Sequence, residues 1–181
     1  MSVDRHCARD LALPRYREEL VAAITRDVTT DPRVRAAFVG GSLGAGDVDL
    51  YSDIDLRIVV DAEDVDDLVA NKTVRPQRWG SVLFYEDLGP RVAHTVAHFE
   101  GFIKVDCFYY RVPEVTPSLA LQNIRILHDP EGLGATCSVG PSRSSTIRRR
   151  PRWNAGAIKC WPTDMRSTGG VGAGNYPMHA R

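Results

Sequence analysis

The sequence predicts an α/β (α+β) domain with a mixed sheet and helices packed on one side, followed by a disordered basic tail. Apolar residues at helical spacing occupy residues 14–30, and short apolar runs that suit strands follow them, separated by glycines, prolines and acidic residues. From Thr136 onward, no period of 2 or 3.6 residues is sustained. These observations place a folded domain over residues 1–135 and a low-complexity tail over residues 136–181.

The first expected element is a helix over residues 14–30. Pro14 suits a first helical turn, and Asp31-Pro32 ends the helix because the residue before a proline avoids the helical backbone region. Its apolar residues lie near helical spacing: Leu20, Val21, Ile24 and Val28.

Short apolar runs predict the strands, and residues 62–71 predict a short helix with a solvated acidic face. Glu100-Gly101 predicts a two-residue hairpin turn. A last structured segment, residues 120–127, runs into a turn at 128–132. The expected strands are residues 33–39, 56–60, 79–85, 92–99 and 102–110.

Two aspartates, Asp53 and Asp55, stand at the start of the second expected strand. Because side chains alternate along a strand, both carboxylates point to one face, where they repel each other unless a cation lies between them. Hard divalent ions such as Mg²⁺ take oxygen ligands of this kind together with substrate phosphates. The first strand ends in Gly40-Gly41-Ser42, a turn that brings backbone N–H groups and a hydroxyl to where such phosphates would lie. The stretch therefore predicts half of a site for a metal-bound nucleotide.

A third acid is expected from Asp106, which stands between apolar neighbours in a strand. An isolated carboxylate in such surroundings costs free energy unless it is paired or metal-bound. Lys104 lies two residues away, hence on the same face, and is expected to offset phosphate charge.

Gly41-Ser42, Asp53-Ile54-Asp55 and Asp106 together resemble the pattern of the polymerase-beta-like nucleotidyltransferase superfamily, over roughly residues 34–129. The spacing is most similar to that of the bacterial antibiotic (aminoglycoside or lincosamide) nucleotidyltransferases and of the minimal nucleotidyltransferases. The resemblance implies that Asp53, Asp55 and Asp106 are catalytic and hold two Mg²⁺ ions. It also implies that Gly41, Ser42 and Lys104 contact the nucleotide.

The implied reaction moves a nucleoside monophosphate, AMP from ATP, to a hydroxyl of a small-molecule acceptor such as an aminoglycoside or lincosamide, with pyrophosphate leaving. Asp106 would ligate the catalytic ion or take the proton of the acceptor hydroxyl. A homodimer is compatible with both groups. The alternative is an inactive or antitoxin-like minimal nucleotidyltransferase that binds or acts on a protein or RNA partner.

Several neighbouring patterns compete with this interpretation. Asp47-Val48-Asp49 is a second acidic pair, but no apolar run follows it directly, so a solvated loop is expected. His94 and His98 are expected to be ordinary sheet histidines, and Cys107 to pack in the core opposite Asp106. Residues 40–44 fit the G-x-S-x-G letters of a hydrolase elbow, yet Gly44-Ala45-Gly46-Asp47 would break the long helix that an elbow requires.

Composition separates the tail from the domain. The net charge of zero hides eight basic residues and one acidic residue from Thr136 onward, against 15 basic and 22 acidic residues before it. The tail is interpreted as a truncated or frame-shifted remnant of a helical acceptor domain, or as a basic segment that touches nucleic acid. No RNA-binding motif accompanies it, so nucleic acid is not an expected partner. Four scattered cysteines, no secretory signal and no run of 18 apolar residues favour a cytoplasmic protein without a membrane span.

Overall fold

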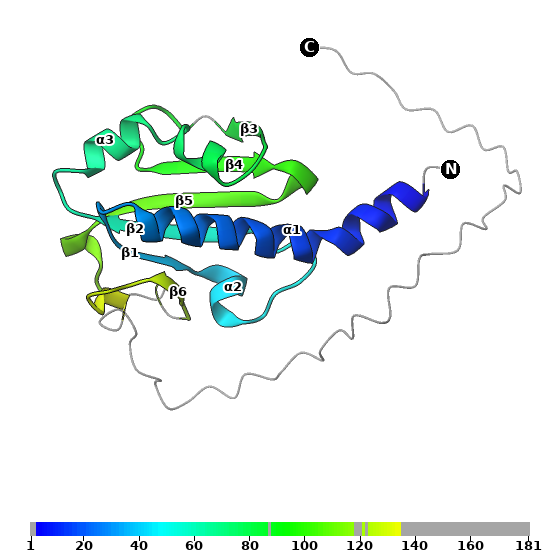
Figure 1. The fold of residues 1–181 in the computed structure, drawn as a ribbon, viewed down its shortest axis with the longest axis horizontal. Coiled ribbons are helices and arrows are strands. Elements are labelled where there is room, and N and C mark those ends of the chain that lie inside the picture. Colours follow the sequence, from blue (N-terminus) through cyan, green and yellow to red (C-terminus); the bar gives the residue numbers. More distant parts are fainter. Residues whose placement is uncertain (1–2, 87, 118–120, 122, 135–181) are drawn as a thin grey trace, which may run out of the picture. The chain divides into compact units, whose positions relative to one another are not determined.

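The computed structural model describes residues 3–86, 88–117, 121 and 123–134 (Figure 1). The chain divides into two units, Met1–Ser145 and Thr146–Arg181, and every described residue belongs to the first. The predicted disordered tail, residues 136–181, lies outside the described residues.

The fold is α+β and is built on one six-stranded mixed sheet in the order β3-β4-β5-β2-β1-β6 (Figure 1). Neighbouring strands are antiparallel except β2 and β5, which pair in parallel. The elements are α1 (Val3–Thr30), β1 (Val34–Val39), α2 (Gly41–Ala45), β2 (Ile54–Val60), α3 (Val65–Ala70), the 3₁₀ turn η1 (Arg75–Arg78), β3 (Val82–Glu86), β4 (His94–Phe99), η2 (Glu100–Phe102), β5 (Lys104–Arg111), η3 (Val112–Glu114) and β6 (Arg125–His128).

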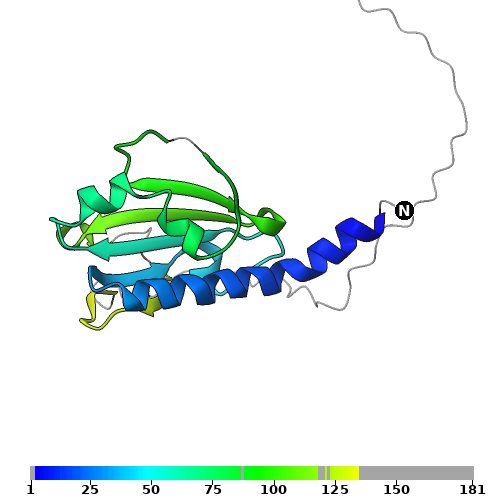
Figure 2. The ribbon, with the colours of Figure 1, turned by 45° about the horizontal axis from the view of Figure 1, so that its top comes forward.

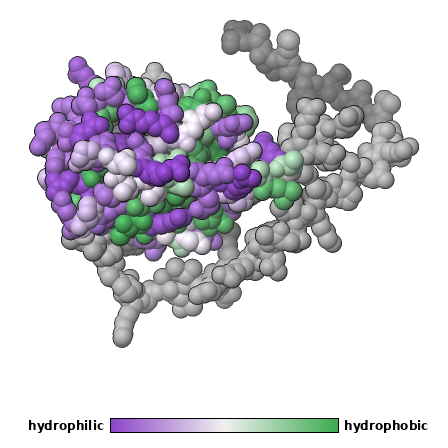
Figure 3. All heavy atoms as spheres, viewed as in Figure 1, coloured by the Kyte–Doolittle hydropathy of each residue, from purple (hydrophilic) through white to green (hydrophobic). Residues whose placement is uncertain are grey.

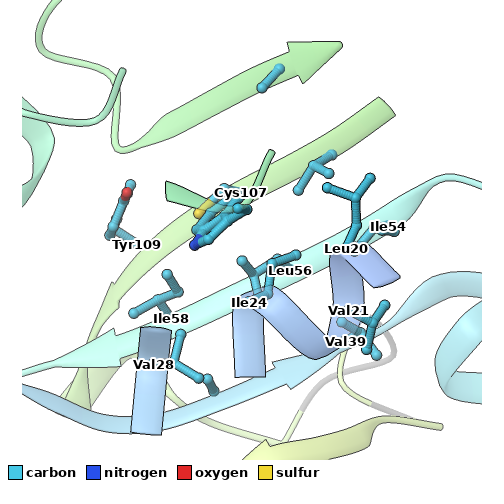
Figure 4. Close-up of a cluster of buried hydrophobic side chains, with 14 of the residues drawn as sticks. Leu20, Val21, Ile24, Val28, Val39, Ile54, Leu56, Ile58, Cys107 and Tyr109 are labelled. Atoms are coloured by element: carbon cyan, nitrogen blue, oxygen red, sulfur yellow. The ribbon is translucent and has the colours of Figure 1, made fainter. Parts of the chain in front are cut away.

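Helix α1 lies across one face of the sheet (Figures 1 and 2) and forms the main core with it. Figure 4 shows the apolar stripe of α1 turned toward the central strands β1, β2 and β5. The stripe is buried because its residues recur at helical spacing and meet the inward-facing side chains of these strands. The side chains from the two sides include Leu20, Val21, Ile24 and Val28 from α1 and Val39, Leu56, Ile58 and Cys107 from the sheet. Helix α3 adds Val65 and Leu68 to the same core, which confirms that these helices share one side.

The opposite face of the sheet carries a smaller apolar cluster and then a polar region. The cluster comprises Ala36, Phe38, Val59 and Leu121, with partly buried residues from the segment after β5 packed against it. The polar region lies at the N-terminal ends of β2 and β5, next to Asp53 and Lys104. Figure 3 shows that the surface seen from the α1 side is mostly hydrophilic, with separate hydrophobic patches.

Helix α1 is longer than predicted. It begins at Val3, so Pro14 lies inside the helix and not in its first turn. An interior proline removes one backbone hydrogen bond, but contacts made on either side of it hold the helix: Leu13 is buried, and the Arg17 side chain donates to loop carbonyls. Among the described residues, no helix is both long and apolar enough to cross a membrane.

The expected strand over residues 79–85 was wrong at its start. Trp79 follows η1 and is buried, with its ring stacked on Phe99 and its indole N–H donating to Asp27 at 2.9 Å. Strand β3 begins only at Val82. The apolar run at residues 79–85 therefore contains a buried side chain that precedes the strand, Trp79, and the strand itself. The spacing of apolar residues alone does not show where the strand begins.

The β4–β5 hairpin is confirmed, but its turn differs from the expected two residues. Residues 100–102 form the short turn η2, closed by a hydrogen bond from the Phe99 N–H to the Ile103 carbonyl at 2.8 Å. Gly101 and Phe102 both have positive φ, at 80° and 62°. In the last expected segment, residues 120–127, the described strand is β6, which pairs with β1 at residues 125–128.

A buried polar network fastens the C-terminal end of α1 to η1. The Arg75 guanidinium is almost fully buried and lies 2.7 Å from a carboxylate oxygen of Asp27 and 3.1 Å from one of Asp31. Burial raises the pKa of Asp31, but the hydrogen bonds from Arg33 and the charge of Arg75 outweigh it and lower that pKa to about 2. Ionised Asp31 therefore stabilises the fold through its contacts with Arg33 and Arg75.

Stability is expected to fall in acid through Asp31. Its folded pKa lies below the ordinary 3.8, so its stabilisation is complete above about pH 4 and is lost as the pH falls through about 2. Urea unfolding of wild type and Asp31→Asn should show a free-energy difference that shrinks by about 1–2 kcal/mol between pH 6 and pH 2. Asp66→Asn, at a side chain that is 95% exposed, is the matched control. An Asp31→Asn difference that stays constant with pH contradicts the assignment.

The core contact of α1 is expected to dominate stability. Ile24 is fully buried, whereas Leu11 on the same helix is 65% exposed. Ile24→Ala should lower the free energy of unfolding by about 2–5 kcal/mol because it leaves a cavity. Leu11→Ala should change it by about 0.5 kcal/mol or less. Similar losses for both variants in a denaturant titration would mean that α1 does not pack through this stripe.

Candidate functional site

Asp55 and Asp106 are direct neighbours across the parallel pair β2–β5. Residues opposite each other in such a pair point to the same face. Their strand neighbours Ile54, Leu56, Val105 and Cys107 are buried in the core beneath α1. Both aspartates therefore point to the other, polar face. Two acids separated by 51 positions in the sequence are brought together by this one strand pairing.

Lys104 joins this pair to Asp53, which stands just before β2. Its ammonium Nζ lies 3.0 Å from Oδ2 of Asp53 and 2.9 Å from Oδ2 of Asp106. Hydrogen bonds to Asp106 and Asp53 raise the pKa of Lys104 well above its ordinary value. The side chain of Asp106 is 14% exposed, while that of Asp53 is 42% exposed. The ammonium thus offsets the charge of two of the three predicted carboxylates.

The Gly41 backbone lies directly against the Asp55 carboxylate. A Cβ added at Gly41 would collide with Oδ2 of Asp55, and its φ of +59° is itself unfavourable for other residues. The Gly40 N–H donates to the Asp55 carbonyl at 2.9 Å. Ser42 follows in the first turn of α2, where backbone N–H groups have no partner within the helix. The glycine-serine turn and the acidic pair therefore form one continuous site.

Arg57 is a site neighbour that the sequence analysis missed. It is 9% exposed, and one guanidinium nitrogen, NH1, donates to the Asp55 carbonyl at 3.1 Å. The guanidinium packs so closely on Gly40 that a Cβ there would collide with it, and its carbon lies 5.6 Å from the centre of the Phe108 ring. The alternation of Asp53, Asp55 and Arg57 along one strand face was a signal that could have identified it.

His94 is the second residue that was missed. It is a strand residue, as expected, but Nε2 lies 3.2 Å from Oδ1 of Asp106, and its ring stacks on Phe108 with centroids 3.9 Å apart. His98 makes similar contacts: its Nε2 lies 2.8 Å from Oε1 of Glu86, and its ring stacks on Phe84. The hairpin register decides these contacts. The two-residue turn expected at residues 100–101 would have set that register one residue off, with His94 opposite Cys107 and not opposite Phe108.

The competing patterns fall where they were expected. The Asp47-Val48-Asp49 pair lies in an exposed loop. Cys107 is buried on the core face, where burial raises the pKa of its thiol to about 12. Helix α2 ends at Ala45, and the Gly46 backbone is left-handed with φ of 71°, so the long helix of a hydrolase elbow is absent after Ser42.

Asp53, Asp55 and Asp106 offer carboxylate oxygens, the kind of ligand that Mg²⁺ takes, but their side chains do not surround one common point. Within the described part of the chain, no three His, Cys, Asp or Glu side chains are grouped as ligands for a metal. The Lys104 ammonium nevertheless occupies a cation position between Asp53 and Asp106. Carboxylate oxygens are the ligands that Mg²⁺ prefers. If the Lys104 side chain rotated away, Oδ2 of Asp53 and Oδ2 of Asp106 would lose their present partner.

Comparisons with known proteins add no assignment. No protein-family model matches the chain, and no curated protein matches it significantly. The function is therefore inferred from the geometry of the site and from its sequence pattern.

Close contact with Asp55 should make Gly41 the more sensitive of two left-handed glycines. Gly41→Ala is expected to lower the free energy of unfolding by about 2–4 kcal/mol, because backbone strain and overpacking add. Gly46 has a similar φ but open space around its α-carbon, so Gly46→Ala should cost only about 1–2 kcal/mol. Urea unfolding measures both. Equal costs would show that Asp55 does not pack on Gly41.

Proposed function

We propose that this protein is a metal-dependent nucleotidyltransferase that moves a nucleoside monophosphate, AMP from ATP, to a hydroxyl of a small-molecule acceptor. The observation that carries the proposal is the register of Asp55 opposite Asp106, with the Gly41-Ser42 turn packed against Asp55. These contacts bring together the two parts of the family pattern: the carboxylates, which would bind a cation, and the glycine-serine turn, which would bind phosphates.

Asp53, Asp55 and Asp106 would hold Mg²⁺ through their carboxylate oxygens. When bound, Mg²⁺ supplies positive charge that offsets the negative charge developing on the phosphate oxygens. Lys104, which now bridges Asp53 and Asp106, would then be available to pair with a phosphate oxygen. His94 would hold the orientation of Asp106 through their contact at 3.2 Å.

Ser42 and the backbone N–H groups of the turn would bind the β- and γ-phosphates. This places the leaving pyrophosphate on the Gly41 side of the carboxylates. The acceptor oxygen forms a bond to the α-phosphorus, and the bond from that phosphorus to the bridging oxygen breaks. Its electron pair leaves with pyrophosphate, while the hydroxyl proton passes to Asp106 or to water. The protein contributes positioning and charge, as phosphoryl-type transfers require.

Removal of one carboxylate should abolish transfer while the fold remains. Asp55→Asn and Asp106→Asn are expected to reduce pyrophosphate release by about 100-fold or more. The assay supplies Mg²⁺, ATP and a panel of hydroxyl-bearing aminoglycosides, lincosamides and neutral ring compounds. Asp47→Asn, in the exposed acidic pair of the neighbouring loop, is the matched control and should retain activity within about twofold.

Circular dichroism and thermal melts verify that each variant is folded. Full turnover by Asp55→Asn or Asp106→Asn refutes the assignment of these carboxylates. Absence of pyrophosphate release by the wild type over the whole panel contradicts transfer to acceptors of these kinds.

A further inference from the structure

A cavity of about 110 Å³ opens beside Asp53, at the edge of the sheet where β2 and β5 begin. Three segments form it: the N-terminal half of α1, the loop before β2, and the turn between β4 and β5. Of the residues that line it, only Asp53 belongs to the proposed site for a cation and phosphates. An apolar cavity of about 150 Å³ binds benzene, so this volume is on the order of one six-membered ring.

The position of the cavity gives an acceptor a path to Asp53. In the sheet order, β2 lies between β5 and β1. The Gly41 turn follows β1, whereas Phe102 and Ile103, which line the cavity, precede β5. The cavity therefore borders the start of β2 beside α1 and the segment before β5, and it meets the proposed site only at Asp53. An in-line displacement requires the attacking oxygen and the leaving pyrophosphate on opposite sides of the phosphorus. An acceptor in this cavity would approach Asp53 from a segment other than the Gly41 turn.

Two exposed aromatic side chains line the cavity. Tyr51 and Phe102 are each 67% exposed, so their rings are accessible to a ligand. Phe102 has a φ of 62°, a left-handed conformation that costs a bulky residue free energy and that concentrates at functional positions. The Tyr51 hydroxyl lies 3.2 Å from Asp10, which holds that ring in place. Buried Leu13 and Ile103 give the cavity apolar walls.

The charges that line the cavity do not suit a polycation. They are two arginines, Arg9 and Arg17, and one aspartate, Asp53. Arg9 pairs with Asp10 at 2.7 Å, and Asp53 pairs with Lys104 at 3.0 Å. Arg17 is buried, and its guanidinium donates to the carbonyls of Asp49 and Ser52, both at 2.9 Å. A ligand that enters therefore meets a neutral to positive lining with aromatic faces.

We infer that this cavity is the acceptor site and that the acceptor presents a single neutral ring that carries the reacting hydroxyl, as a phenol does. The ring stacks on Phe102 and Tyr51, and its hydroxyl points toward Asp53. This inference rests on the proposed function, and it selects a neutral ring compound over a polycationic aminoglycoside.

The test uses 4-fluorophenol as the probe and follows its ¹⁹F signal on titration with the full chain, with neither nucleotide nor metal added. Wild type should broaden and shift the signal, and Phe102→Ala should weaken binding by about tenfold, the loss expected for removal of a stacking ring and its contact area. Phe102→Tyr, which keeps a ring, should restore binding. Phe84→Ala removes an exposed ring on β3, outside the cavity, and should bind as wild type does.

The outcomes separate this inference from the proposed function. Asp106→Asn should lose pyrophosphate release yet bind 4-fluorophenol normally, because Asp106 does not line the cavity. If Phe102→Ala is not folded, Tyr51→Ala replaces it with the same expectation. The acceptor site is overturned if wild type does not bind the probe, or if the ring-removing variant binds as tightly as wild type. It is also overturned if kanamycin displaces the probe, or if ATP displaces it, which would make the cavity the site of the donor base.

Discussion

The parallel pairing of β2 with β5 is the constraint on which the candidate site depends. In a sheet whose other neighbours are antiparallel, this pair starts both strands at the same edge, and its register places Asp55 beside Asp106. A parallel pair needs a crossover connection. Here the crossover contains α3 and the β3–β4 strands, so the segment between the two acids also supplies His94 to the site and extends the sheet.

The two faces of β2 and β5 carry different kinds of side chain. One face of β2 and β5 is buried under α1 and supplies the apolar area that holds the domain together. The other face gathers three carboxylates, which would repel each other if left uncompensated. The Lys104 ammonium, which lies between Asp53 and Asp106, provides that compensation for two of them.

Local rules in the sequence predicted much of this arrangement. Strand alternation predicted that Asp53 and Asp55 share one face, and that Lys104 and Asp106 share one face. The family resemblance predicted that the two pairs meet, and the register of β2 with β5 brings them together. Arg57, His94 and the cavity beside Phe102 were not predicted. Alternation along β2 could have indicated Arg57, whereas the contacts of His94 and the cavity depend on the hairpin register and on loop geometry, which side-chain periodicity does not specify. The length of α1 was underestimated because Pro14 was interpreted as part of the first helical turn. Contacts on both sides of Pro14 hold a helix that begins at Val3.

Paramagnetic broadening of amide NMR signals by Mn²⁺, in the presence of a non-hydrolysable ATP analogue, tests the central claim most directly. If the three carboxylates form one cation site, the amide signals around Asp53, Asp55 and Asp106 broaden together at the same Mn²⁺ concentration. The signals of the exposed Asp47-Val48-Asp49 loop should not broaden at a lower Mn²⁺ concentration than these. Broadening that begins elsewhere, or that reaches Asp55 without reaching Asp106, would contradict a shared site.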